Sequence, residues 1–287
     1  MDSISKPAIS VVIPAYNEEE GIAEVIRQIR SLPLSTELIV VDDGSEDTTA
    51  RRAEEAGARV IRHPRNRGYG AALKTGILAS TADAVVITDA DGTYPNDRIP
   101  ELVALLEDND MVVGARTGTK AAIPWARRPA KWLLNRLADY LSESKIPDLN
   151  SGLRAFRRQR IIDYLRILPS GFSFTTTITV AMHVSEHPIA YVPIDYYQRH
   201  GRSKIRPLHD TLNFIALIVR TVVYFRPLKI FLPISGVLFL AAVAIFIYSA
   251  LYTEKIMDAS VTITLMTSFQ MAAIGLLADL IDKRSQR

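Results

Sequence analysis

Two long uncharged stretches near the C-terminal end constrain this chain more than any other feature. Residues 230–252 contain no charged side chain, and residues 259–280 contain one, Asp279, close to their end. Either stretch is long enough for a helix to cross roughly 30 Å of hydrocarbon. We therefore predict transmembrane helices at 230–252 and 259–280, because this length disfavours the alternative of a buried core helix.

The flanking charges predict how these two helices are oriented. Cations lie at both outer ends of the pair, whereas the connecting residues 253–258 hold one lysine against two acids. By the positive-inside rule, we expect a hairpin with both chain ends, and the domain that precedes it, on the cytoplasmic side. Polar residues in the second span are expected to face the first helix or a second copy of the chain in a homo-oligomer. They are Thr262, Thr264, Thr267, Ser268 and Gln270.

The rest of the chain divides into a globular domain and a connector. Residues 1–206 have the composition of a folded domain, and the first eight show no apolar run that would indicate a signal peptide. Residues 207–229 carry apolar side chains around most of a helix and arginines near its end, which predicts an amphipathic helix in the membrane interface. The chain has no cysteine, which excludes disulfides and thiolate metal sites.

Short apolar runs alternate with helical patterns over the first 115 residues. We predict strands at 9–13, 38–41, 58–61, 84–88 and 111–113, and helices at 18–29, 45–57, 70–79 and 100–107. Continuous apolar strands separated by helices indicate an α/β fold with a mostly parallel, Rossmann-like sheet covered on both faces. Further on, we expect a basic helix at 124–145, a loop leading into a helix at 148–158, and a strand at 190–197.

Three of these strands end in polar residues, and ligands of parallel sheets bind beyond the carboxyl ends of the strands. Asp89 and Asp91 follow the fourth strand with one residue between them, and their hard oxygen atoms suit Mg²⁺ or Mn²⁺. Asp42 and Asp43 follow the second strand, where either can accept hydrogen bonds from a base or a ribose. The alternative for both pairs is helix capping, for which Ser45 is a good candidate.

The charge pattern narrows the ligand classes. A carboxylate-rich edge repels a bare diphosphate, so a divalent cation is needed if a diphosphate binds there. Basic residues cluster at 116–136, 154–160 and 199–206, which indicates either solvated helix faces or a basic rim that meets anionic lipid or a phosphorylated substrate. We expect no nucleic-acid binding, because no aromatic and basic binding motif accompanies these clusters.

Six segments carry a family resemblance. VVIPAYNEE, VVDDGSEDTT, GYGAALKTG, TDADGTYP, VVGAR and DLNSGLRAF occur in this order along the chain. They resemble the inverting family-two glycosyltransferases of the GT-A fold, in the branch that contains dolichol-phosphate mannose synthase and polyprenyl-phosphate glucosyltransferases. The resemblance covers residues 8–206, and the two apolar spans that follow are similar to those of the membrane-anchored members.

The resemblance implies a nucleotide-sugar donor bound with Mg²⁺ or Mn²⁺. The implied donor contacts are Pro14, Ala15, Tyr16, Glu18, Asp42, Asp43, Lys74, Asp89, Ala90 and Asp91, of which Asp89 and Asp91 would hold the metal. The implied contacts of an acceptor phosphate are Arg116, Arg127, Arg128, Lys131, Arg202, Ser203 and Lys204. Asp148 stands where related enzymes have a catalytic acidic residue, so the predicted catalytic residues are Asp91, Asp148 and Arg116. The mannose synthases read DADLQ where this chain reads DADGT, so Thr93 replaces a glutamine that assists their metal.

The expected reaction is transfer of the sugar, with inversion, to a polyprenyl or dolichyl phosphate in the membrane. A phosphate monoester has a second pKa of about 6, so near neutrality it needs cations and positioning more than a base. If the acceptor is instead a glycan or glycolipid hydroxyl, Asp148 would be the general base. Two further functions fit the sequence less well. Asp89 and Asp91 argue against an inactive membrane scaffold, and a nucleotidyltransferase would carry a glycine-rich loop after the first strand, where this chain has none.

Overall fold

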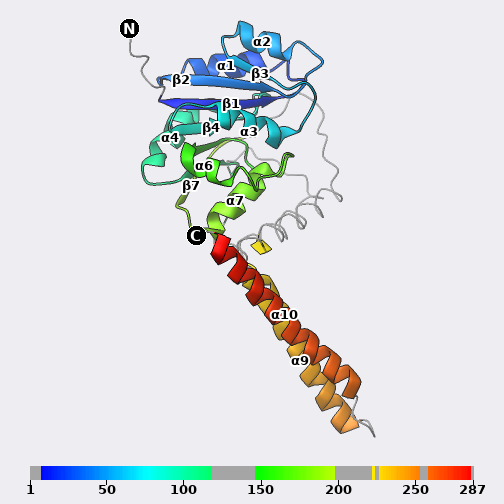
Figure 1. Cartoon of the computed structure of the whole chain (residues 1–287). Helices are drawn as coiled ribbons and strands as arrows, with labels where there is room; N and C mark the ends of the chain where they lie inside the picture. The colour runs from blue at the N-terminus through cyan, green and yellow to red at the C-terminus, as the bar shows by residue number, and fades with distance from the viewer. Residues whose placement is uncertain (1–7, 118–145, 198–221, 224–225, 253–257, 286–287) are drawn as a thin grey trace. The chain divides into compact units, whose positions relative to one another are not determined.

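The computed structural model describes residues 8–117, 146–197, 222–223, 226–252 and 258–285. The chain forms two compact units, residues 1–214 and residues 215–287. The first unit holds an α/β domain, and the second holds a pair of long helices (Figure 1).

Within the described residues, the strands of the first unit form one sheet in the order β3-β2-β1-β4-β6-β5-β7. They are β1 (Ile9–Ala15), β2 (Thr36–Asp42), β3 (Arg59–Arg62), β4 (Ala84–Ile87), β5 (Met111–Ala115), β6 (Arg154–Arg157) and β7 (Ile189–Pro193). β3, β2, β1 and β4 run parallel, β6 runs antiparallel to both β4 and β5, and β5 is parallel to β7. The predicted α/β fold with a mostly parallel sheet is confirmed.

One strand contradicts the sequence interpretation. Residues 148–158, predicted as a loop leading into a helix, contain β6, in which Ala155 pairs with both β4 and β5. The sequence Arg-Ala-Phe-Arg conceals this strand because a charged residue, Arg154, takes a fully buried position in it. The predicted helix begins only at Arg158, as α6 (Arg158–Tyr164).

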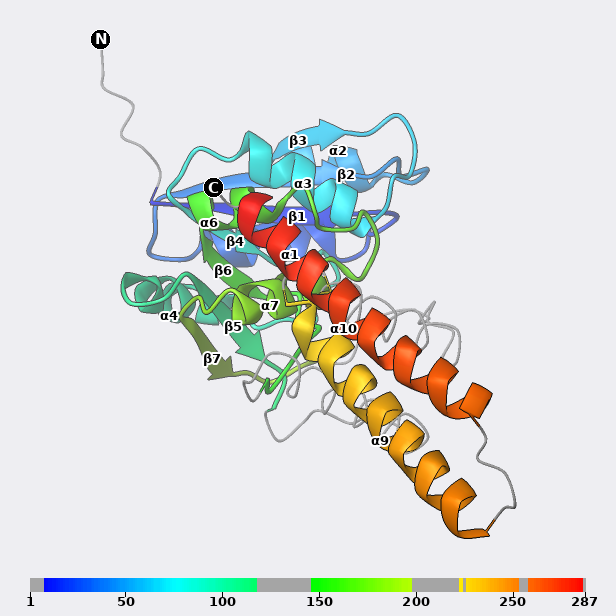
Figure 2. The same cartoon turned by 60° about the horizontal axis from the view of Figure 1, so that its bottom comes forward.

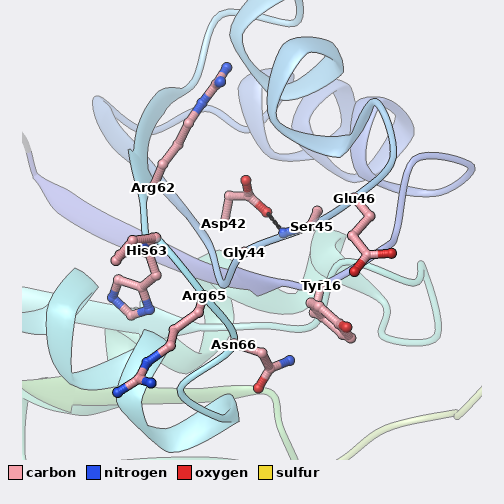
Figure 3. A pocket seen from close by; sticks show the side chains of 10 residues that line it. Tyr16, Asp42, Gly44, Ser45, Glu46, Arg62, His63, Arg65 and Asn66 are labelled. Atoms are coloured by element: carbon pink, nitrogen blue, oxygen red, sulfur yellow. Dashed lines mark hydrogen bonds between the residues drawn. The ribbon is translucent and has the colours of Figure 1, made fainter.

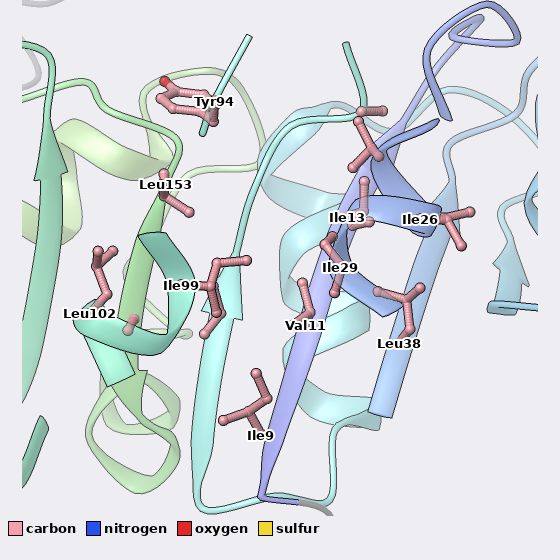
Figure 4. Packing of buried hydrophobic residues seen from close by; sticks show 14 of the residues in the cluster. Ile9, Val11, Ile13, Ile26, Ile29, Leu38, Tyr94, Ile99, Leu102 and Leu153 are labelled. Atoms are coloured by element: carbon pink, nitrogen blue, oxygen red, sulfur yellow. The ribbon is translucent and has the colours of Figure 1, made fainter. Parts of the chain in front are cut away.

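Helices cover both faces of the sheet. Ile9, Val11 and Ile13 alternate along β1 and pack in one cluster with α1 (Ile22–Arg30) and α4 (Ile99–Ala104) (Figure 4). On the opposite face, the intervening residues of β2 meet α3 (Tyr69–Ala79), and β6 meets α7 (Phe174–Val184). Two 3-10 helices, η1 (Asn96–Arg98) and η2 (Leu105–Glu107), flank α4. Packing of these helices on the sheet holds β1, β2 and β4 in place, so that the residues after each strand lie at the same edge of the sheet.

The loop between β2 and α2 (Thr49–Glu55) corrects the prediction that Ser45 caps a helix. Thr48 occupies the N-cap position of α2. The Ser45 hydroxyl instead accepts a hydrogen bond from the Asn17 backbone N–H at 3.0 Å. The Asn17 side chain in turn accepts from the Glu46 backbone N–H at 2.9 Å, so the loop is fixed to the end of β1 rather than wound into a helix.

The second unit contains α9 (Leu228–Tyr252) and α10 (Asp258–Ser285), which pack along each other (Figure 2). In the spans Leu228–Tyr252 and Ala259–Ile281, the most apolar 18 residues have mean hydropathies of 2.7 and 1.7. Few of the residues in the most apolar part of each span are buried. Two exposed apolar helices of this length fit a membrane hairpin.

Polar contacts inside the hairpin confirm part of the expectation for its second span. The Ser235 and Ser268 hydroxyls each donate a hydrogen bond to the backbone carbonyl of the other residue, both at 2.9 Å. Thr264 and Thr267 donate to carbonyls of α10 itself. Gln270 is exposed on the hairpin, and self-association of two copies stays a prediction.

Two expected elements lie wholly or mostly outside the described residues. These are the basic helix at 124–145 and the interfacial helix at 207–229. The domain limits that depend on them stay predictions.

Candidate active site

A pocket of about 490 Å³ opens where the first three strands of the sheet end (Figure 3). Its lining residues are Tyr16, Asp42, Gly44, Ser45, Glu46, Arg62, His63, Pro64, Arg65 and Asn66. The parallel register pairs Ala15 with Asp42 and Asp42 with Arg62, so three strands stop at the same level. Gly44 has a φ of +78°, and a Cβ added there would lie 2.6 Å from the carbonyl carbon of Arg65. Glycine therefore allows the loops after β2 and β3 to approach each other and form the pocket wall.

The two aspartates after β2 have different surroundings. The Asp42 side chain lines the pocket, and its Oδ1 accepts a hydrogen bond from a backbone N–H of the loop that follows it, at 3.1 Å. One Asp43 oxygen lies 2.6 Å from His63 Nδ1. The Asp43 carboxylate also accepts hydrogen bonds from the backbone N–H groups of Arg67 and Gly68 at 3.0 and 2.7 Å. The geometry favours Asp42 for a base or ribose and makes Asp43 the anchor of the loop after β3.

Of the other predicted contacts of the nucleotide-sugar donor, some lie at the pocket and one, Lys74, lies outside its lining. Pro14 and Ala15 are buried at the end of β1 and position Tyr16, which lines the pocket. Glu18 follows in the same loop, and its backbone N–H donates a hydrogen bond to α2 at 2.8 Å. Lys74 lies on α3, outside the residues that line the pocket, and partial burial lowers the pKa of its ammonium group.

The predicted metal-binding pair, Asp89 and Asp91, follows β4, which pairs with β1. Asp89 Oδ1 accepts a hydrogen bond from the Tyr69 hydroxyl at 2.9 Å. Asp91 Oδ1 accepts from the Thr93 backbone N–H at 3.1 Å and from the Thr93 hydroxyl at 2.6 Å. Thr93, which stands in place of the glutamine of the resembling enzymes, therefore holds the Asp91 carboxylate in place. Ala90, between the two aspartates, is buried in the core.

The chemistry of this pair fits Mg²⁺ or Mn²⁺. Both carboxylates are partly exposed, and each is oriented by a hydroxyl group, as metal-binding carboxylates commonly are. Within the part of the chain that the structure describes, no group of three or more histidine, cysteine, aspartate or glutamate residues could hold an ion by itself. Two carboxylates suit a cation that completes its coordination with waters and substrate phosphates, which is the usual way in which proteins bind Mg²⁺.

A buried ion pair dominates the other half of the site, which we call the acceptor half after the predicted role of Arg116. Arg116 follows β5 and Asp148 precedes β6. Arg116 Nε and Nη2 donate to the two Asp148 oxygens at 2.7 and 2.9 Å, and the Arg116 backbone N–H adds a bond at 3.0 Å. The Asn150 backbone N–H donates a further bond at 3.0 Å. The Asp148 side chain is 4% exposed and the Arg116 side chain 24%.

These contacts hold Asp148 in its charged form. Burial opposes ionisation, but the hydrogen bonds and the positive charge of Arg116 outweigh burial and lower the pKa of Asp148 to about 2. Burial also opposes the charge on Arg116, yet its bonds to Asp148 raise the pKa of the guanidinium above its usual range. A carboxylate with so low a pKa is a poor proton acceptor near neutrality, so the pair is suited to orienting charge rather than to moving a proton.

Aromatic residues connect the acceptor half to the metal-binding pair. The Tyr196 ring centroid lies 5.3 Å from Cζ of Arg116 and 5.3 Å from the Tyr94 ring, which it meets edge to face. The Tyr94 hydroxyl accepts a hydrogen bond from the Gly152 backbone N–H at 2.6 Å. Gly152 also abuts Asp89, because a Cβ added to this glycine would lie 2.8 Å from Asp89 Oδ2. The loop after β4 and the loop before β6 therefore pack on each other.

Arg154 lies under the acceptor half and is fully buried. Its guanidinium donates to the carbonyls of Leu149 and Ser151 at 2.9 and 2.7 Å and to Thr179 Oγ1 at 2.5 Å. The charge pattern predicts either a solvated helix face or a basic rim for the cluster at 154–160. Both predictions are wrong for Arg154, because it is fully buried. The other arginines of the cluster, Arg157, Arg158 and Arg160, hydrogen-bond to groups of the domain itself. Arg154 instead fixes the loop that presents Asp148.

Several acceptor contacts remain predictions, because Arg127, Arg128, Lys131, Arg202, Ser203 and Lys204 lie outside the described residues. The sequence interpretation also missed residues that the structure brings to the site, namely His63, Tyr69, Tyr94, Arg154 and Tyr196. A sequence signal existed for two of them. Tyr69 stands between two glycines and Tyr94 precedes a proline, both within motifs that follow a predicted strand.

Known proteins share this sequence pattern. Residues 10–165 match the family described as Glycosyl transferase family 2, and residues 226–283 match the GtrB C-terminal hairpin. The dolichyl-phosphate hexose transferase of Haloferax volcanii is 35% identical over 69% of this chain and 87% of its own. The undecaprenyl-phosphate 4-deoxy-4-formamido-L-arabinose transferase of Proteus mirabilis is 30% identical over 96% of this chain and 88% of its own.

Solved structures share the fold. Glucosyl-3-phosphoglycerate synthase from Mycobacterium tuberculosis, in complex with Mn²⁺, UDP-glucose and phosphoglyceric acid, matches with a TM-score of 0.59 and 28% identity. The match covers 75% of this chain and 80% of that one. The same synthase has also been crystallised with Mg²⁺ and UDP. The GT-A fold that the sequence motifs implied is confirmed.

Proposed function

The chain belongs to glycosyl transferase family 2, and on that basis we propose that it transfers a sugar from a nucleotide-sugar donor to a polyprenyl phosphate in the membrane. The product is a sugar linked to the lipid through a single phosphate. Relatives named for transfer to dolichyl or undecaprenyl phosphate support this acceptor. The observation that carries the proposal is the Arg116–Asp148 pair, in which a fixed cation is held by a carboxylate that is unsuited to act as a base.

The donor occupies the half of the site built on the ends of β1, β2 and β4. Asp42 binds the ribose or base in the pocket, and Tyr16 forms part of the wall. Asp89 and Asp91 would hold Mg²⁺ or Mn²⁺, and the related synthase, crystallised with Mn²⁺ and UDP-glucose and with Mg²⁺ and UDP, supports a divalent cation in this half. When bound, the cation stabilises negative charge on the departing nucleoside diphosphate.

The acceptor phosphate reacts without a protein base. One phosphate oxygen forms a bond to the anomeric carbon while the bond from that carbon to the diphosphate breaks, and the electron pair leaves with the nucleoside diphosphate. The anomeric configuration is inverted, because attack and departure occur on opposite faces. A phosphate monoester is largely dianionic at neutral pH, so the task of the protein is to orient it. Arg116 does this as a planar donor whose direction is fixed by Asp148 and by the Tyr196 ring.

The hairpin holds the reaction at the lipid surface. The phosphate of a polyprenyl phosphate lies at the level of the lipid headgroups, and α9 and α10 fit an anchor that keeps a domain there. Cations at both outer ends of the hairpin favour a cytoplasmic position for the domain and for both chain ends. A nucleotide-sugar made in the cytoplasm would then reach the site directly.

The test is a donor and acceptor panel with the full chain in lipid nanodiscs. Mn²⁺, UDP-sugars or GDP-sugars, and a short-chain polyprenyl phosphate are supplied, with the corresponding polyprenol as the matched acceptor. We expect at least one donor to glycosylate the polyprenyl phosphate, and no donor to glycosylate the alcohol, by mass spectrometry of the extracted lipids. Glycosylation of a hydroxyl acceptor and never of the phosphate would overturn the proposal in favour of a reaction with Asp148 as base.

A further inference from the structure

We propose that Tyr69 is a positioning residue for the metal-binding carboxylate Asp89, and that it connects this carboxylate to the loop of residues 169–173. This inference rests on the proposed function only for the role of the metal. Tyr69 begins α3, on a different segment from the aspartate pair, and neither the family motifs nor the charge pattern assigned it a role.

The first observation is the contact of the Tyr69 hydroxyl. It donates a hydrogen bond to Asp89 Oδ1 at 2.9 Å. A carboxylate that binds a metal must keep one rotamer, and a hydrogen bond from a neighbouring donor favours that rotamer before the metal arrives. Asp91 has an equivalent donor in Thr93, two residues further along the chain. Tyr69, on α3, donates a hydroxyl hydrogen bond to Asp89, and Thr93, two residues along the chain, donates one to Asp91.

The second observation is what holds the Tyr69 ring. It stacks on Phe172 with 5.5 Å between ring centroids and 19° between planes. The rings belong to segments whose backbones touch, because the Ala71 backbone N–H donates to the Ser170 carbonyl at 3.0 Å. A Cβ added to Gly70 would lie 2.3 Å from the Pro169 carbonyl oxygen, so glycine is needed for this approach.

The third observation is where the loop of residues 169–173 leads. It enters α7, whose residue Thr176 donates a hydrogen bond to the Asn150 side chain. Asn150 donates its backbone N–H to Asp148, the partner of Arg116. Tyr69 therefore connects Asp89, a carboxylate of the donor half, to the loop of residues 169–173. The helix that follows this loop, α7, contacts the acceptor half.

The expected consequence is a change in metal affinity. Tyr69→Phe removes one oxygen atom and leaves the ring and its stacking on Phe172 in place. Loss of a hydrogen bond to a metal ligand commonly costs about 10- to 100-fold in metal affinity. We therefore expect Tyr69→Phe to weaken Mn²⁺ binding by about this factor and to raise the Mn²⁺ concentration for half-maximal rate in parallel. At saturating Mn²⁺ the kcat should fall by less than about 5-fold, because the ligand itself is intact.

The experiment measures Mn²⁺ binding directly. Full-length protein in nanodiscs is titrated with Mn²⁺ in the presence of UDP or of GDP, without acceptor, and free Mn²⁺ is read by electron paramagnetic resonance. Tyr164→Phe is the matched control, because Tyr164 also bonds through its hydroxyl, but to His187, which lies just before β7 and not at the carboxyl end of β4. This control should keep wild-type Mn²⁺ affinity within about 2-fold.

Phe172→Ala tests the connection to the loop. It removes the stacking partner and keeps the Tyr69 hydroxyl, so we expect Mn²⁺ affinity to fall by about 2- to 10-fold, the range that a stacked aromatic pair contributes. Wild-type Mn²⁺ affinity in Tyr69→Phe would overturn the positioning role, and wild-type affinity in Phe172→Ala alone would overturn the connection. Because no acceptor is present, weakened Mn²⁺ binding supports the inference even if polyprenyl phosphate proves not to be the substrate.

Discussion

The donor half and the acceptor half of the site are held together by different means. In the donor half, neighbouring strands end at one level, and their carboxylates are fixed by nearby backbone N–H and hydroxyl groups, as Asp43 and Asp91 are. In the acceptor half, the ion pair between Arg116 and Asp148 makes the main connection, across 32 positions of the sequence, and backbone N–H groups of Arg116 and Asn150 add to it. In the proposed reaction, a metal ion bound with the nucleotide-sugar requires oriented oxygen atoms, whereas an acceptor phosphate requires a positively charged side chain that is already in place. The two constructions match these two needs.

The largest expected effect is on kcat, and it differs between a variant of the donor half and a variant of the acceptor half. Asp91→Asn removes a charge from the proposed metal-binding pair, and we expect kcat to fall by about 100- to 1,000-fold, since a metal supplies several kcal/mol of charge stabilisation. Asp148→Asn keeps an oxygen acceptor for Arg116 and should cost only about 10- to 30-fold, toward the low end of what one charged hydrogen bond contributes, about 1.5–3 kcal/mol. Steady-state rates at saturating Mn²⁺ compare the two. Equal and complete loss in both variants would mean that Asp148 does chemistry after all.

The next effect tests whether charge pairing holds the acceptor half together. Arg116→Gln leaves the buried Asp148 carboxylate without its cation, which should lower the free energy of unfolding by about 3 kcal/mol. The double variant Arg116→Gln with Asp148→Asn should recover part of this loss, because no uncompensated charge is then buried. Denaturant unfolding of the four proteins gives the coupling. Additive losses would show that the pair contributes nothing specific.

A smaller effect distinguishes the two aspartates of the donor half. Asp42→Asn should raise the KM for the nucleotide-sugar by about 10-fold with no change in Tm, because Asp42 lines the pocket. Asp43→Asn should lower stability by about 1–3 kcal/mol, because its carboxylate anchors Arg67, Gly68 and His63. Thermal unfolding and donor kinetics on both variants check the assignment. The reverse pattern would assign the ligand contact to Asp43.

The last effect appears only in acid and concerns stability. The pKa of Asp148 is about 2 in the folded protein and 3.8 for an unperturbed aspartate, so the unfolded chain binds the proton more tightly. The resulting stabilisation, about 2 kcal/mol, is fully present above pH 4 and is lost as the pH falls from about 4 to about 2. The stability difference between wild type and Asp148→Asn should therefore shrink over that window in acid titrations followed by circular dichroism. A difference that stays constant down to pH 2 would contradict the low pKa.

The donor half could be predicted from the sequence because its geometry follows from periodicity. Apolar runs fix β1, β2 and β4, and parallel pairing then brings the residues after each run to one edge. The sequence could not show which of Asp42 and Asp43 faces the pocket and which anchors a loop. It depends on the direction in which the chain leaves β2, and on the loop after β3 that packs against Asp43.

The acceptor half could be predicted only as a set of motifs. Its frame is β6, an antiparallel insertion whose sequence carries arginine where a core strand usually carries an aliphatic residue. Burial of Arg154 is stabilised by carbonyls of a loop and by Thr179, which are contacts that no local pattern encodes. The bidentate Arg116–Asp148 pair likewise depends on β5 and β6 lying side by side.

The central claim is that the acceptor is a phosphate that reacts without a protein base, and the pH dependence of kcat/KM for the acceptor tests it most directly. The acidic limb of the profile should follow the second pKa of a polyprenyl phosphate, about 6, since the dianion is the reactive form. A difluoromethylenephosphonate analogue, whose second pKa is lower, should shift this limb to lower pH by the difference between the two second pKa values. A limb that stays at one pH for both acceptors would belong to a group on the enzyme and would contradict the account.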